Sequence, residues 1–420
     1  MHSGLRDNWA LFFGVAMIMV GNGLLGTLLT IRGLDIGFST GMIAFIQLGY
    51  PAGALLGTLF VPRIIAHVGH VRAFSALASI CSAAAIVHLM SSDLIVWTGM
   101  RVLAGICFPG LYVITESWLN AKASNSNRAQ LLSLYFVTQS FGSAAGVWMA
   151  GLNDLSGTNL FALVSIILSL SLVPLLLSAR PAPNYIAPER MSLIALFRVS
   201  PMAFSGAILS GALAGSLFVG FPIYALKTGA SAAQASSILA LTTLIGAFAF
   251  FPAGWVSDRI DRRYVVFSLA LGAALVSVME AILPGRTELF ATFSFFAAFS
   301  TPIYAICLAH GNDQLRPSQI VPASGAMVFV QNIGILIGFG SSPLSSEIAS
   351  GRGYPGLLAV ISLLLIVITL IRRANSNAPK ESGTARATTS LTAPQTGQLQ
   401  SDLRGNQQSL LSRAEQTDPS

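Results

Sequence analysis

The chain repeats itself at one constant offset of 192 residues. Residues at separate places in the first half recur 192 positions later, and no gap is needed to align them. The matching residues are Leu34, Gly37 and Ser39 with Leu226, Gly229 and Ser231; Tyr112 with Tyr304; Asn120 with Asn312; and Gln139, Gly142 and Gly146 with Gln331, Gly334 and Gly338. One offset that serves all of these places indicates two structurally equivalent halves.

The composition indicates that both halves lie in a membrane. Hydrophobic residues make up 54% of the chain, charged residues make up 9%, and the mean hydropathy is +0.71. Soluble domains carry roughly 25% charged residues. Uncharged runs long enough to cross a hydrocarbon core about 30 Å thick recur from Trp9 to Ile371. A duplicated, apolar chain of this kind is typical of a membrane transporter.

The apolar runs predict an all-α membrane protein with twelve transmembrane helices, six in each half. The predicted spans are 9–31, 39–62, 73–91, 94–118, 129–150, 160–178, 201–225, 233–256, 264–283, 288–310, 321–343 and 355–371. The domains predicted from them are an N-terminal six-helix bundle over 1–179, a cytoplasmic linker over 180–200, a C-terminal six-helix bundle over 201–373, and a disordered cytoplasmic tail over 374–420. The repeat relates the two bundles by a pseudo-twofold axis.

The distribution of Lys and Arg predicts the orientation. If the N-terminus is cytoplasmic, eighteen of the 23 Lys and Arg residues fall on the cytoplasmic side, and four fall in outer loops. Lys and Arg prefer the cytoplasmic side, so we expect both termini to be cytoplasmic. The positive charge then reflects this bias and contact with anionic lipid headgroups rather than nucleic acid.

The sequence lacks the motifs that are typical of several other kinds of activity. The sequence has no phosphate-binding loop, no zinc-protease helix motif and no nucleophile elbow, which argues against an ATP-driven pump and an enzyme. The spacing of Cys and His suggests no metal site, and we expect no cofactor. The three cysteines fall inside apolar spans, where they are expected to be buried and unpaired.

The segment 254–263, which reads G-W-V-S-D-R-I-D-R-R, resembles the loop signature of the major facilitator superfamily. It lies between the second and third spans of the second half, where that signature belongs. The resemblance implies the major facilitator fold. It also implies that the loop helps to lock one face of the transporter. The residues expected to take part are Gly254, Asp258, Arg259, Arg262 and Arg263. The first-half copy has Ala66 at the acidic position, so we expect this contact in one half only.

Arg101 is the one Lys or Arg predicted inside a span, in a stretch that resembles the fourth-span pattern of the same superfamily. Burying it costs about 2.5–3.5 kcal/mol or more, so it should face the bundle interior. Three roles stay open: a structural bond to backbone carbonyls, coupling to a proton-carrying group, and contact with an anionic group of the substrate.

Further along the same span lies Glu116, about 22 Å from Arg101 along the helix and too far to pair with it. We expect Glu116 to form a gating ion pair with Arg128 or the basic loop 259–263, as the resemblance to sugar porters implies; the alternative is a solvated carboxylate. The stretch T-E-S-W-L-N, together with the L-A-H-G-N-D stretch at 308–313, resembles the YcaD-like subfamily. Glu116, His310 and Asp313 are the coupling candidates. Glu280 and Glu347 fall near outer span ends, where we expect hydration.

The resemblance also implies a central cavity lined by polar residues near mid-span. The candidates are Asn22, Gln47, Tyr50, Arg101, Gln139, Thr242, Thr243, Gln331 and Asn332. Buried amides need partners, which can be one another or a ligand. Interhelical hydrogen bonding is therefore an equal alternative for each amide.

The sequence as a whole predicts a multi-pass inner-membrane carrier that moves a small solute by alternating access, with H⁺ as the candidate coupling ion. We expect it to act as a monomer surrounded by membrane lipids. Alternatives are a membrane receptor or sensor on the same fold, a drug-efflux antiporter, and a membrane-embedded enzyme using Arg101 and Glu116; the estimated distance between those two residues opposes the last.

Overall fold

The computed structural model describes residues 2–122, 128–152, 159–177, 191–283, 289–348 and 352–374, and its regular elements are helices. The predicted tail 374–420 lies outside the described residues except for Ala374. The first-half helices are α1 (His2–Asp35), α2 (Thr40–Val68), α3 (His70–Met90), α4 (Leu94–Lys122), α5 (Arg128–Met149) and α6 (Asn159–Leu177). The second-half elements are α8 (Pro201–Gly215), η1 (Ser216–Gly220), α9 (Phe221–Lys227), α10 (Ala232–Ser257), α11 (Arg262–Ile282), α12 (Leu289–Ser300), α13 (Ile303–Asn312), α14 (Pro317–Ser345) and α15 (Gly353–Ala374).

Eleven helical segments in the described part of the chain are long and apolar enough to cross a membrane. They coincide with eleven of the twelve predicted spans. The remaining predicted span, 129–150, is the helix α5, which carries more polar residues than the others. It packs against α1 of its own half and α10 of the other half, so protein rather than lipid covers much of its surface.

Three details differ from the sequence prediction. Part of the predicted linker forms a short helix, α7 (Leu193–Val199). Ser192 caps its N-terminus, because the Ser192 side chain accepts a hydrogen bond from the backbone N–H of Ala195 at 3.1 Å. The seventh span contains the π-helical turn η1. The tenth span is interrupted between α12 and α13, at Thr301 and Pro302; proline has no N–H to continue the helical ladder.

The turns that follow the first span of each half have the same structure. Gly37 and Gly229, 192 residues apart, have φ angles of 91° and 92°, which favour glycine. Ser39 and Ser231 then cap α2 and α10. Each serine side chain accepts one hydrogen bond, at 3.2 Å, from the backbone N–H of the residue three positions later in the sequence. The repeat in the sequence is therefore a repeat in backbone conformation.

The packing of the first span against the fifth is also repeated. A Cβ on Gly146 of α5 would lie 2.1 Å from the carbonyl oxygen of Val20 on α1, and a Cβ on Gly338 of α14 would lie 2.3 Å from the carbonyl oxygen of Ala212 on α8. Val20 and Ala212 are themselves 192 residues apart. Only glycine permits the helix backbones to approach this closely.

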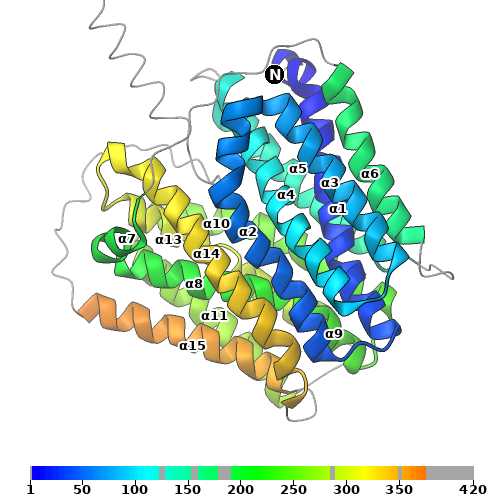
Figure 1. Cartoon of the computed structure of the whole chain (residues 1–420). Coiled ribbons are helices and arrows are strands. Elements are labelled where there is room, and N and C mark those ends of the chain that lie inside the picture. Colours follow the sequence, from blue (N-terminus) through cyan, green and yellow to red (C-terminus); the bar gives the residue numbers. More distant parts are fainter. Residues whose placement is uncertain are drawn as a thin grey trace, which may run out of the picture.

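Each half has an apolar core, and the second-half core also includes Ala144 and Val147 of α5. The halves make their largest contacts along two helix pairs, α2 with α14 and α5 with α10. Figure 1 shows the halves close together around α9 and the beginning of α2, and well apart at the other end, where the marked N-terminus and α7 lie. We call the first end the predicted outer end and the second the predicted inner end, after the Lys and Arg distribution.

Candidate functional site

Arg101 lies in the interior of the first half, among polar groups of α1 and α2. It is 3% exposed, and its Nε donates a hydrogen bond to Gln47 Oε1 on α2 at 3.0 Å. Gln47 Nε2 in turn donates to the carbonyl oxygen of Gly26 at 2.9 Å and to Thr30 Oγ1 at 2.8 Å, both on α1. The Arg101 guanidinium also lies over the Tyr50 ring, 4.5 Å from its centroid.

A second set of hydrogen bonds extends this network toward the predicted inner end. Asn22 Nδ2 on α1 donates to the Tyr112 hydroxyl at 2.8 Å and to the Tyr50 hydroxyl at 3.3 Å. Asn22, Tyr50 and Tyr112 are half-buried, whereas Gln47 and Arg101 are buried. We call Asn22, Gln47, Tyr50, Arg101 and Tyr112 the arginine cluster.

Tyr112 was not among the predicted cavity residues, although a signal for it exists in the sequence. It lies eleven residues after Arg101, which is about three helical turns, so both side chains share one face of α4. The same spacing argument could have found the face of α1 that carries Asn22, Gly26 and Thr30, at intervals of four residues.

The remaining predicted cavity residues do not join the arginine cluster. Gln139 is half-buried on α5, and Gln331 is half-buried on α14. Asn332 donates a hydrogen bond to the carbonyl oxygen of Val328 on its own helix at 2.9 Å. On α10, Thr243 likewise donates to the carbonyl oxygen of Leu239, whereas the buried Thr242 hydroxyl has no partner among the described residues.

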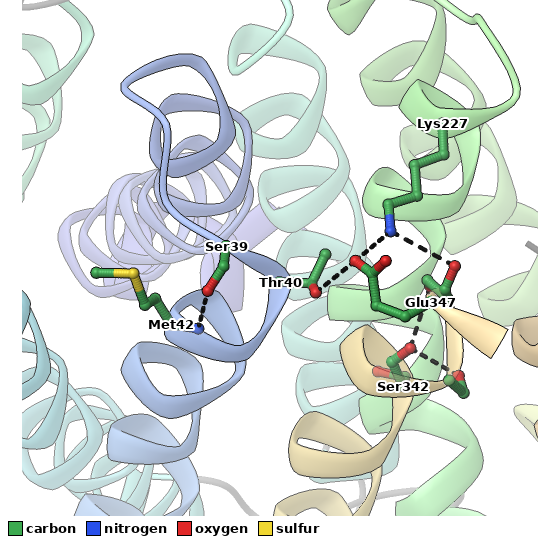
Figure 2. Close-up of polar contacts among 8 residues, drawn as sticks. Ser39, Thr40, Met42, Lys227, Ser342 and Glu347 are labelled. Atoms are coloured by element: carbon green, nitrogen blue, oxygen red, sulfur yellow. Dashed lines mark hydrogen bonds and ion pairs between the residues drawn. The ribbon is translucent and has the colours of Figure 1, made fainter.

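At the predicted outer end, one carboxylate links the two halves. Glu347, which follows α14, accepts hydrogen bonds at Oε1 from Lys227 Nζ at 2.5 Å and from Thr40 Oγ1 at 2.7 Å. Lys227 ends α9 in the second half, and Thr40 begins α2 in the first half (Figure 2). The hydrogen bond from Lys227, then the one from Thr40 and the Lys227 charge, lower the pKa of Glu347 below its ordinary value.

An apolar cluster from both halves lies beneath this link. Ile43 of the first half packs with Val219, Ile223 and Phe339 of the second half, and all four side chains are buried. Tyr50 packs against this cluster while its hydroxyl belongs to the arginine cluster. We call the apolar cluster together with Thr40, Lys227 and Glu347 the outer seal.

At the predicted inner end, the superfamily-like loop is held within its own half. Arg262 Nε donates to Asp313 Oδ2 at 2.6 Å, and Arg262 Nη1 lies 3.5 Å from Asp258 Oδ1. The guanidinium of Arg259 stacks on Trp255 at 3.8 Å from the ring centroid. Gly254 is half-buried, and its carbonyl oxygen accepts the backbone N–H of Asp258. The loop thus joins α10, α11 and the end of α13.

The other predicted gating residues lie around this loop. Glu116 accepts a hydrogen bond from the Tyr135 hydroxyl of α5 at 3.2 Å. Arg128 begins α5, but its side chain lies outside the described residues, so the Glu116–Arg128 pair stays a prediction. Arg263 is half-buried in the first turn of α11. His310 is buried, and its Nε2 accepts a hydrogen bond from Gln314 Nε2 at 2.8 Å.

The first half replaces the arginine–carboxylate contact with a histidine–serine contact. His70 occupies the position equivalent to Arg262, and its Nε2 lies 3.0 Å from Ser117 Oγ on α4. Both contacts connect the beginning of the third span to the fourth span of the same half. The two halves therefore share this connection, but only the second half has the acidic partners Asp258 and Asp313.

The expected hydration of Glu280 is wrong. Glu280 lies near the end of α11 but is only 2% exposed, and it accepts a hydrogen bond from the Tyr224 hydroxyl of α9 at 2.7 Å. Tyr224 packs in turn against Phe293 and Tyr354. The Tyr224 side chain of a neighbouring helix therefore lies against the buried Glu280 carboxylate.

The comparison with protein families decides the class of the protein. The sequence model of the Major Facilitator Superfamily matches residues 11–229 and again residues 203–412. The chain belongs to the Major Facilitator Superfamily. It is therefore a membrane transporter rather than an enzyme, and the two overlapping matches agree with the duplicated halves.

Relatives among curated proteins support the predicted subfamily. An uncharacterized MFS-type transporter of Yersinia enterocolitica is 24% identical over 375 residues, covering 88% of this chain and 96% of the relative. The uncharacterized MFS-type transporter YcaD of Salmonella newport is 25% identical over 379 residues, covering 88% and 97%. The resemblance to YcaD-like transporters is thus confirmed at a distance.

Solved structures confirm the fold. The nucleoside transporter NupG matches with a TM-score of 0.71 at 13% identity, covering 89% of this chain and 99% of NupG. A bacterial homologue of the human lysosomal transporter Spinster, in an inward-facing and occupied conformation, matches with a TM-score of 0.70 at 16% identity, covering 88% and 95%. The Escherichia coli fucose:proton symporter FucP, in the outward conformation, matches with a TM-score of 0.59 at 15% identity, covering 90% and 100%.

Proposed function

We propose that this transporter moves a small solute across the cell inner membrane by alternating access, with both termini cytoplasmic and a monomer as the working unit. The observation that carries the proposal is the outer seal. It joins the halves through Thr40 and Glu347 and through a shared apolar cluster, while the arginine cluster lies on the inner side of that cluster. In this reading the structure is the inward-facing state.

The same geometry supplies the two kinds of contact that alternating access requires. The Arg262–Asp313 and His70–Ser117 contacts hold each half together as a unit, because each lies within one half. The Thr40–Glu347 contact lies between the halves, so it must break when the outer end opens. Because the first two contacts stay intact and the third breaks, each six-helix bundle can move as a unit. We infer that the bundles rock against each other about the pairs α2–α14 and α5–α10.

H⁺ is the coupling ion we propose. Glu116, His310 and Asp313 supply titratable groups near the predicted inner end, and Glu116 is held by Tyr135 rather than by a described basic residue. The substrate cavity and gate residues predicted from the sequence are proposed to act in these roles.

Solute counterflow in proteoliposomes tests the proposal. Metabolites and drugs that stabilise the purified protein in a thermal-shift screen would be loaded on one side, and the entry of labelled solute from the other side would be measured. A carrier exchanges labelled solute against unlabelled solute without an applied gradient. Binding without exchange would instead indicate a receptor or sensor and would contradict the proposal.

A further inference from the structure

Arg101 is a buried cation without a described anionic partner. Its two close partners, the Gln47 side-chain oxygen and the Tyr50 ring, are both neutral. Its Nη1 is buried and has no hydrogen-bond partner among the described residues. The ionisable groups near it include Tyr50, Tyr112, Cys81 and His88, none of which is a carboxylate. A guanidinium in such a place is costly unless an anion joins it.

The groups around Arg101 are suited to an anion. The Tyr50 ring lies against the cation, and its hydroxyl is linked through the Asn22 amide to the Tyr112 hydroxyl. These three groups can donate hydrogen bonds once they turn from one another toward a ligand. On the α1 side, Gly26 packs directly against the guanidinium, since a Cβ there would lie 3.3 Å from Arg101 Nη2. A guanidinium edge with unused N–H groups matches the two oxygens of a carboxylate or phosphate.

The two other roles considered for Arg101 fit the structure less well. A structural bond to backbone carbonyls is not the contact that forms, because Arg101 donates to a side-chain amide that is already fixed by Gly26 and Thr30. Proton coupling would need a titratable acid beside the guanidinium. Glu116, on the same helix, is bonded to Tyr135 instead.

We propose that the arginine cluster binds the anionic group of the transported solute, and that the solute is therefore a carboxylate or a phosphate compound. This inference rests on the proposed transport function. Arg101 forms the charged contact, Asn22 and Tyr112 orient the group, and Tyr50 lies between the bound anion and the outer seal. The energetic cost of the buried cation in the empty protein is offset when the anion binds.

Thermal unfolding of the purified protein tests this proposal. The protein would be measured in a detergent with neutral headgroups. It would also be measured in nanodiscs of neutral lipid and, separately, in nanodiscs of anionic lipid. The probes would be matched pairs, namely acetate with acetamide, benzoate with benzamide and succinate with succinamide, together with inorganic phosphate. At least one anionic probe should raise the unfolding temperature of the wild type while its neutral partner does not. Stabilisation by anionic lipid alone would assign the site to a headgroup and overturn the proposal.

Two variants separate a binding role from a structural one. Arg101→Met removes the charge and keeps a long side chain. Arg63→Met makes the same change at an exposed position of α2, where Arg63 Nη1 donates a hydrogen bond to the Leu59 carbonyl of its own helix. Arg101→Met should lose the anion response, with an apparent affinity about tenfold or more weaker. It should also unfold at the wild-type temperature or above without ligand, because an unpaired buried charge has been removed. Arg63→Met should keep the anion response.

Three results would overturn the inference: a lower unfolding temperature of ligand-free Arg101→Met, an anion response that survives in this variant, or a wild type that responds to no anionic probe. These results differ from failure of the proposed function. If counterflow shows exchange of a neutral solute that does not depend on Arg101, only the anion inference is wrong. If no solute is exchanged although an anion binds at Arg101, only the transport proposal is wrong.

Discussion

Adding one methyl group at Gly146 should separate α1 from α5 and lower the stability of the first half. The new Cβ would lie 2.1 Å from the carbonyl oxygen of Val20 and 2.7 Å from the backbone nitrogen of Leu24. Ordinary van der Waals contact begins near 3.4 Å, so the helices must move apart by about 1.3 Å at that oxygen. Backbone atoms cannot turn away as a flexible side chain can. Overpacking of this kind typically costs about 1–3 kcal/mol.

The duplicated architecture makes the same prediction for Gly338→Ala. There the Cβ would lie 2.3 Å from the carbonyl oxygen of Ala212, which requires α8 and α14 to separate by about 1.1 Å. Gly99→Ala is the matched control, since Gly99 lies within α4 and has no heavy atom within 4 Å of the added Cβ. It should be neutral or stabilising by up to about 1 kcal/mol.

The assay is thermal unfolding of the three purified variants and the wild type in one detergent at one scan rate. Gly146→Ala and Gly338→Ala should both unfold several degrees below the wild type, and Gly99→Ala should not. If the control falls as far as the other two, the loss reflects glycine replacement in general. If only one of the paired glycines is sensitive, the equivalence of the two halves is refuted at these contacts.

Three further predictions concern the ends of the bundle. Asp258→Asn weakens one acidic contact of Arg262, so transport in proteoliposomes should fall while membrane insertion stays normal; wild-type rates would remove its assigned role. Deleting residues 375–420 should leave transport unchanged, and a loss of transport would show that the tail acts in the mechanism. Because the pKa of Glu347 is lowered by Lys227 and Thr40, the link at the outer seal is present above the ordinary carboxylate pKa and is lost as the pH falls through the lowered value. Labelling of a cysteine introduced at the predicted outer end should therefore increase in acid, and Glu347→Gln should remove this pH dependence; equal dependence in both proteins would contradict the assignment.

The repeat allowed much of the fold to be predicted, because a constant offset gives equivalent residues equivalent backbone positions. Ser39 and Ser231 cap their helices alike, and Gly146 and Gly338 pack against matching carbonyl groups. Arg101 could be predicted to face the bundle interior because lipid does not tolerate a guanidinium. Its amide and aromatic partners on α1 and α2 were predicted as individual cavity residues, but the bonds among them were not.

The remaining features depend on how helices distant in the sequence meet. Thr40 and Glu347 are 307 residues apart and touch only because the halves close at one end, and hydrophobic periodicity carries no information on that closure. Glu280 is buried against Tyr224 of another helix. Its position near the end of a span therefore led to the wrong prediction that it is hydrated. The helix α7 was missed because seven residues are too few to show a helical pattern.

Electron–electron distance measurements between spin labels on the two halves test the central claim of a rocking pair of bundles most directly. One pair would join Ser92→Cys to Arg352→Cys at the predicted outer end, and another would join Val68→Cys to Ile260→Cys at the predicted inner end. All four positions are exposed, and the native cysteines are buried. Glu347→Gln, which weakens the outer seal, should lengthen the outer distance and shorten the inner one relative to the wild type. Distances that stay unchanged, or that change in the same direction at both ends, would contradict alternating access by two rigid halves.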